Sequence, residues 1–287
     1  MPSLKEIKGR IGSVKSTLKI TSAMKLVASA KLRKAQQTIE GMRPYERKLQ
    51  EIMAHVVAAS GAKLSGAFAP KESAPKKVAI VAFASNSSLC GAFNANAVRL
   101  ALETVKSYGD TEVTVYSVGR KMAESMKKAG YPSPKDYQQM ADKPSYAPAA
   151  ELAESLMEAF REGRLDRVEL VYNHFVSSGK QVPMRETFLP MEPVISGEVE
   201  KSDIEYIIEP SAKELLEDLL PKSLKLKFFT ALLDSNASEH AARTVAMQTA
   251  TDNGEDLLQE LTLQYNKSRQ QKITSEILDL AGGSQQQ

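Results

Sequence analysis

The sequence predicts an α/β protein in which two long terminal helices form an antiparallel two-helix coiled coil, with a small, Rossmann-like α/β domain of mainly parallel sheet inserted between them. The part from Lys222 to Ala281 has no proline and a single glycine, Gly254. A continuous helix of that length spans roughly 90 Å, about three times the width of a small domain. The N-terminal part carries a matching helical pattern, and strands alternate with helices between them. We expect three parts, 1–58, 75–208 and 211–284.

The N-terminal helix has the apolar spacing of a coiled-coil seam, with steps of three and four residues. The residues in this pattern are Leu4, Ile7, Ile11, Val14 and Leu18. We expect the seam to continue through the small residues Ala23, Val27, Ala28 and Ala30, with Met24 and Leu26 beside them. Gly41 and Pro44 predict a kink or a stop in this helix.

The C-terminal helix carries a similar apolar pattern, and Pro221 is expected to be its first residue, where a missing N–H costs nothing. Its predicted seam consists of Phe229, Leu233, Ala237, Ala241, Val245, Leu258, Leu261, Tyr265, Ile277 and Leu280. The alternative is a bundle in which both segments fold back on themselves. Gly254 is the one candidate position for the turn that such a bundle requires.

The middle of the chain alternates strands and helices, which predicts a small α/β domain. We expect strands at Lys77–Ala84, Glu112–Val118, Arg167–Val176 and Gln181–Leu189, of which the last two form a hairpin. We expect one helix that ends near Ser107 and two more at Gly119–Ala129 and Ala149–Arg161. A proline-containing loop precedes the last of these helices.

Composition excludes several classes of site. The single cysteine, Cys90, excludes an intramolecular disulfide, and the three histidines lack the spacing of metal ligands. No apolar run approaches the roughly 20 residues that cross a bilayer, and the N-terminus has no signal-peptide pattern. We expect a soluble, intracellular protein.

The first strand–helix turn, Ser85–Asn94, is where such folds often bind nucleotides. It contains one glycine, Gly91, and lacks both the G-x-G-x-x-G and the Walker patterns. The chain also lacks a G-x-S-x-G motif and a histidine placed to serve a nucleophile. We therefore expect no catalytic residue, no cofactor and no metal.

Positive charge is concentrated in the N-terminal helix. Although the net charge is only +3, residues 1–39 contain nine Lys or Arg residues and one acid, Glu6. Such a run is usually a solvated face. Binding to nucleic acid is a second interpretation, although no aromatic residue precedes Tyr45. An acidic protein surface is a third possible partner.

Several motifs together resemble the gamma subunit of F-type ATP synthase. They are the stretch from Lys5 to Lys34, the segments Ser238–Arg243, Ala250–Asn253, Leu263–Lys267, Arg269-Gln270 and Ile273–Glu276 near the C-terminus, and Leu89–Gly91, Phe93-Asn94 and Leu170–Asn173 in the middle. The resemblance covers the whole chain. Asn86 and Ser88 depart from it, since the family usually has an acidic residue and a glycine there.

The resemblance implies a non-catalytic central shaft that turns inside a ring of alpha and beta subunits, with the catalytic sites on beta. It implies that the body contacts the epsilon subunit and the membrane c-ring, so that proton flow is coupled to ATP synthesis or hydrolysis. We expect one copy per complex, no nucleic acid, and a peripheral location on the cytoplasmic face of the bacterial inner membrane.

The resemblance also implies site residues. Contacts with beta subunits are expected from Lys19, Met24, Lys25, Lys31, Arg33, Lys34, Arg269 and Gln270, and an apolar bearing tip from Ile273, Ile277, Leu278 and Leu280. Two alternatives of other classes stay open. A nucleotide-using α/β enzyme with a helical arm would bind nucleotide when isolated. A coiled-coil nucleic-acid-binding protein would be retained on DNA, and the retention would fall with salt.

Overall fold

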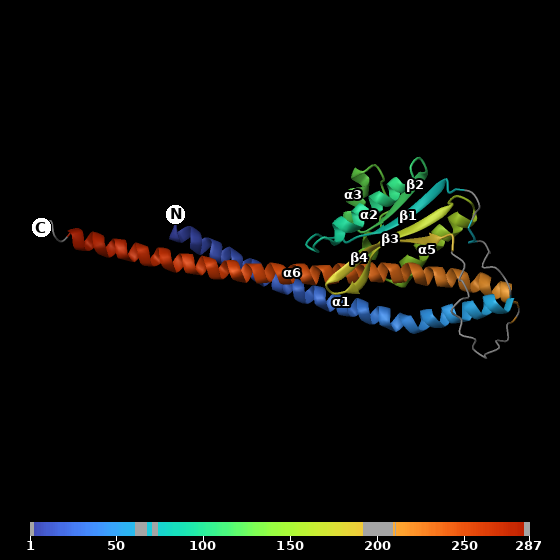
Figure 1. The fold of residues 1–287 in the computed structure, drawn as a ribbon, viewed down its shortest axis with the longest axis horizontal. Helices are drawn as coiled ribbons and strands as arrows, with labels where there is room; N and C mark the ends of the chain where they lie inside the picture. Colours follow the sequence, from blue (N-terminus) through green and yellow to red (C-terminus); the bar gives the residue numbers. More distant parts are fainter. Residues whose placement is uncertain (1–2, 61–67, 71–73, 192–208, 210, 284–287) are drawn as a thin grey trace.

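The protein consists of a long two-helix rod with a compact body packed along part of it (Figure 1). This computed structural model describes residues 3–60, 68–70, 74–191, 209 and 211–283, apart from the side chains of 57–60, 213 and 279–283. The rod is formed by α1 (Leu4–Ser60) and α6 (Ala212–Gly283), which run antiparallel. The body contains β1 (Lys77–Phe83), α2 (Phe93–Ser107), β2 (Glu112–Val118), α3 (Arg120–Lys128), α4 (Gln138–Asp142), α5 (Tyr146–Arg161), β3 (Arg167–Ser177) and β4 (Lys180–Leu189). The predicted fold class is confirmed.

The body is built on a four-stranded sheet in the order β2-β1-β3-β4. Strands β2, β1 and β3 are parallel, and β4 pairs antiparallel with β3, as the predicted hairpin requires. The central strand β1 is buried from Val78 to Phe83, which explains its continuous apolar sequence. The short helix α4 lies in the segment that the sequence predicts as a proline-containing loop.

The sheet separates two apolar cores. On one face, Val78, Ile80 and Ala82 of β1 pack with residues of α2 and α3. On the other face, Ala79, Val81 and Phe83 pack with α5 and with both helices of the rod. The alternation follows from the two-residue period of a strand. The rod is therefore part of the body's own core.

The residues of α1 that face α6 keep the heptad spacing of the first part of the helix. This corrects the prediction that the seam continues through the small residues Ala23, Val27 and Ala30. After Leu18 the residues turned toward α6 continue in steps of three and four, at Thr21, Lys25, Ala28, Leu32 and Ala35. Ala23 and Ala30 are exposed instead, as is Val27 at 57%. In α6 the predicted seam residues Ala237 and Ala241 are fully buried, whereas Val245 is 44% exposed.

Gly254 brings the two helices close together and does not form a turn. Helix α6 continues through it, so the bundle alternative is wrong. A Cβ atom at this position would lie 2.7 Å from Cδ2 of Leu18 in α1. Such a separation is far below van der Waals contact, so the absence of a side chain here lets Leu18 pack against the backbone of α6.

The two prolines of the rod lie inside helices. The predicted helix start at Pro221 is wrong, and of the kink or stop predicted near Pro44 the stop does not occur. Helix α1 does not stop at Pro44, although Figure 1 shows that it changes direction in its light-blue half. Pro221 is likewise an interior residue of α6 and not its first residue. Helix α6 begins next to Ser211, whose Oγ accepts the N–H of Glu214 at 3.3 Å and so acts as an N-cap. Buried leucines on both sides of Pro221, Leu220 and Leu224, hold the helix in the core.

The C-terminal end of α6 extends well past the N-terminus of α1 (Figure 1). Four large apolar side chains of this end are largely exposed, namely Leu263 at 65%, Ile273 at 47%, Ile277 at 59% and Leu278 at 64%. Within the described parts of the chain, no helix combines the length and the apolar character that a membrane crossing needs.

Candidate functional site

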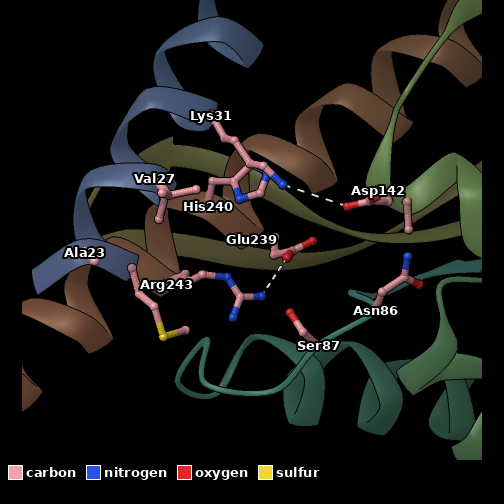
Figure 2. Close-up of a pocket in the computed structure, with 12 residues that line it drawn as sticks. Ala23, Val27, Lys31, Asn86, Ser87, Asp142, Glu239, His240 and Arg243 are labelled. Carbon is pink, nitrogen blue, oxygen red and sulfur yellow. Dashed lines mark hydrogen bonds and ion pairs between the residues drawn. The ribbon is translucent and has the colours of Figure 1, made fainter. Parts of the chain in front are cut away.

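A cavity of about 300 Å³ lies where the rod meets the body. Its walls come from α1, from the loop after β1, from the end of α4 and from α6 (Figure 2). Because the loop follows β1, the cavity lies at the carboxyl end of the parallel strands, where α/β folds commonly place their binding sites. The fold thus brings together four segments that are far apart in the sequence.

The loop wall is held in shape by hydrogen bonds made by its own residues. Asn94 Oδ1 accepts the N–H of Ser85 at 3.0 Å, and Asn94 Nδ2 donates to the carbonyl oxygen of Ser87 at 3.2 Å. Asn86 Nδ2 donates to the carbonyl oxygen of Gln138 at 2.8 Å, which joins the loop to α4. Leu89, at the end of this loop, has a φ of 66° and a side chain that is 61% exposed.

The α6 wall contains a buried ion pair. Glu239 and Arg243, one helical turn apart, are each only 7% exposed, and Arg243 Nη2 donates to Glu239 Oε1 at 2.7 Å (Figure 2). Arg243 Nη1 also donates to the carbonyl oxygen of Ser88 at 2.5 Å. Burial raises the pKa of Glu239, and the neighbouring Arg243 partly opposes this rise. The arginine thus holds a carboxylate in place and fixes the loop at the same time.

His240 is the other buried polar residue of this wall. Burial, together with the nearby charges of Lys31 and Arg243, lowers the pKa of His240 to about 4. The imidazole is therefore neutral at physiological pH. Its Nδ1 atom is buried and has no hydrogen-bond partner among the described residues. Across the cavity, Lys31 Nζ lies 3.8 Å from Asp142 Oδ1 (Figure 2).

The charged side chains that line the cavity are paired with one another. Its two cations are each paired with a carboxylate of the same cavity, so the charges balance. Among the residues that the structure describes, no group of three His, Cys, Asp or Glu side chains could hold a metal ion. Burial also raises the pKa of the neighbouring Cys90 thiol, which keeps it protonated and unreactive.

The predicted contact residues of α1 do not all lie on one face. Lys19, Arg33 and Lys34 are exposed. Met24 and Lys31 line the cavity, and Lys31 is exposed at the same time. Lys25 turns toward α6, where its Nζ donates to Gln248 Oε1 at 2.8 Å. The basic run therefore serves both the surface and contacts within the chain.

The predicted contact residues of α6 lie near the C-terminal end of this helix, far from the cavity. Arg269 and Gln270 are exposed, as are Ile273, Ile277 and Leu278 of the predicted tip. Leu280 lies in α6, but its side chain is outside the described residues.

Sequence reasoning missed the polar residues that line the cavity. Glu239 and Arg243 occur in a predicted motif, and their spacing of four residues inside an alanine-rich segment is a usable signal of an intrahelical pair. Asp142 and Asn86 carry no such signal, because only the packing of the body against the rod brings them to the cavity.

Comparison with known proteins identifies close relatives. A family model described as ATP synthase matches residues 3–285. The chain is 56% identical to an ATP synthase gamma chain of Phocaeicola vulgatus and 55% identical to one of Bacteroides fragilis, with 99% of each chain covered in both cases. A chain of the Euglena gracilis mitochondrial ATP synthase shares the fold at 21% identity, with a TM-score of 0.63 over 98% of this chain and 93% of that one.

Proposed function

We propose how this chain, which belongs to the family of the ATP synthase gamma chains, carries out its role as the central-stalk subunit of an F-type ATP synthase. Gamma chains are non-catalytic, and this membership favours the shaft over the nucleotide-using enzyme and the nucleic-acid-binding protein. The rod stands inside a ring of three alpha and three beta subunits. The body contacts the epsilon subunit and the c-ring, on the cytoplasmic face of the bacterial inner membrane.

The observation that carries this proposal is the rod itself. The end of α6 extends beyond α1 and carries exposed apolar side chains along its last turns. Exposed apolar area is costly in water, at ~25 cal/mol per Å². A contiguous exposed apolar surface is also typical of an interaction site. A surrounding ring of subunits would cover this end of the rod.

In the proposed mechanism the rod shifts populations of conformations and does no bond chemistry. The rod is asymmetric, because the body packs along part of it and one helix is longer than the other. Each beta subunit would therefore meet a different face of the rod. A difference in contact energy between conformations favours one state at each site, and this state changes as the rod turns.

The exposed basic residues Lys19, Arg33 and Lys34 would face acidic loops of the beta subunits. Met24 and Lys31, which line the cavity, and Lys25, which turns toward α6, would do the same. Individual exposed ion pairs contribute only about 0–1 kcal/mol. Such weak pairs would steer the rod and allow it to pass from one subunit to the next. Arg269 and Gln270 would make polar contacts with a beta-subunit loop higher in the ring, where a planar guanidinium suits a fixed carboxylate.

Two experiments test this function. Native chain purified under mild conditions should bring down alpha, beta and epsilon subunits and the c-ring, and recovery of the chain alone would overturn the proposal. In assembled complexes, Met24→Lys should lower the number of protons pumped per ATP hydrolysed, because the added charge forms a new ion pair with a beta-subunit loop. Met24→Leu, of similar volume and without charge, is the matched control. Equal pumping by Met24→Lys and the parent would show that Met24 does not face an acidic loop.

A further inference from the structure

Four side chains in the middle of α6 are hydrogen-bonded to main-chain atoms of the body. Asp234 Oδ1 accepts the N–H of Phe175 at 2.9 Å, Asn236 Nδ2 donates to the carbonyl oxygen of Ala141 at 3.1 Å, Ser238 Oγ donates to that of Asn173 at 2.8 Å, and Arg243 Nη1 donates to that of Ser88 at 2.5 Å. We call Asp234, Asn236, Ser238 and Arg243 the clamp. Its partners belong to three segments of the body, namely β3, the end of α4 and the loop after β1.

The clamp residues lie on two opposite sides of α6. Successive helical residues are rotated by about 100°, so Asp234 and Ser238 lie within about 40° of each other. By the same geometry Asn236 and Arg243 lie close together and roughly 180° away from that pair. Both members of the first pair bond to β3, and the second pair bonds to α4 and the loop. The body therefore holds this helix from two sides.

The bonds on the β3 side belong to the hydrogen-bond network of the body. Ser238 is fully buried, and it donates to the carbonyl oxygen of Asn173. Val171 is the last β3 residue that is paired with β1, so Asn173 lies beyond the end of that pairing. A side chain of α6 thus donates to a strand carbonyl past the end of the β1–β3 pairing.

Helix α1 contacts the same region in a different way. Leu32 and Ala35 pack against Ala237 and Ala241 of α6 in a small apolar cluster. Apolar contact is not directional, whereas hydrogen bonds weaken steeply with a change in distance or angle. A rotation of α6 about its own axis would disturb bonds on both of its sides at once.

We propose that the clamp transmits torque between the body and the rod. It fixes α6 rotationally to the body, and α1 follows α6 through the apolar seam. This inference rests on the proposed function, because torque passes through the chain only if the rod and the body turn together inside a complex. Asp234, Asn236, Ser238 and Arg243 are positioning residues in this scheme and take no part in the chemistry.

The test measures torsional stiffness in assembled complexes. The ring is fixed to a surface, a bead is attached to the body, and the angular fluctuation of the bead is recorded while rotation is stalled. The variant Asn236→Ala/Ser238→Ala removes one bond from each side of the helix. The control Thr244→Ala/Thr249→Ala removes two hydroxyls of α6 that bond only to carbonyl oxygens of their own helix, those of His240 and Val245.

If the four bonds act as independent parallel restraints, loss of two should about double the clamp's contribution to the angular variance. The control should match the parent. If the assembled double variant has the same angular variance as the parent, the proposal that the clamp transmits torque is overturned. This holds even if the unfolding midpoint of the variant falls, because bonds that only stabilise the fold would change stability without changing the variance. If the double variant fails to assemble, each single variant should show a smaller increase, and parental variance in both would also overturn it. A parent complex that never rotates would contradict the proposed function instead.

Discussion

Replacement of Arg243 by methionine should destabilise the protein in a pH-dependent way. Methionine keeps much of the length of the side chain but leaves Glu239 buried without its cation. Removal of one partner of a buried ion pair typically costs about 3–5 kcal/mol. The bond from Arg243 to Ser88 is lost as well, at about 1 kcal/mol.

The charge part of this cost has an upper limit, because Glu239 can take up a proton. Burial already raises its pKa above the ordinary value of 4.5, and the loss of Arg243 removes the main opposing effect. Each pH unit above 4.5 adds about 1.4 kcal/mol to the cost of protonating the carboxyl group, and this cost of neutralisation sets a limit of about 3 kcal/mol near pH 7. A carboxyl with a raised folded-state pKa loses stability as pH rises through that pKa. The charge penalty should therefore be largest near neutral pH and fall below about 1 kcal/mol near pH 5.

The assay is urea unfolding of the full chain followed by far-ultraviolet circular dichroism, with Arg243→Met compared with Arg243→Met/Glu239→Gln. Both variants lose the bond to Ser88, so their difference isolates the buried charge. The double variant should be more stable by about 2–3 kcal/mol near pH 7, and the two should converge near pH 5. Equal free energies of unfolding at both pH values would refute the view that Glu239 is a buried charge held by Arg243.

Three further results are expected. Gly119→Ala should lower the free energy of unfolding, measured in urea, by several kcal/mol more than Gly130→Ala. Both glycines have a positive φ, but only at Gly119 would an added Cβ atom clash, because it would lie 2.1 Å from the carbonyl oxygen of Ala84. Similar losses would show that the clash is relieved. Arg269→Ala should slow ATP turnover of the complex, and unchanged turnover and assembly would mark Arg269 as a solvent-facing residue only. Removal of Ile277 onward should lower complex stability more than turnover, whereas a stable complex that cannot rotate would contradict a bearing role.

The rod, the strands and their approximate bounds could be predicted from local patterns of residues. Period and composition are local properties, so the seven-residue apolar pattern of α1 and the buried run of β1 could be read directly. The N-cap of α6 also has a local signal, because Ser211 and Glu214 have the spacing of a capping box, although the predicted start of the helix is Pro221. Proline is a local signal for a kink or a boundary, and at Pro221 the tertiary packing of the neighbouring apolar residues overrode the predicted boundary.

Which basic residues of the rod make contacts within the chain depends on the tertiary packing of distant segments. Lys25 and Lys31 have the same local character as Arg33, yet the first contacts Gln248 and the second contacts Asp142, which lies more than a hundred residues away in the sequence. Gly254 could be read as a turn until Leu18 was placed against it. The cavity and the clamp also depend on the docking of the body onto α6. The clamp residues bond to main-chain atoms of distant segments, and main-chain atoms leave no pattern in the sequence.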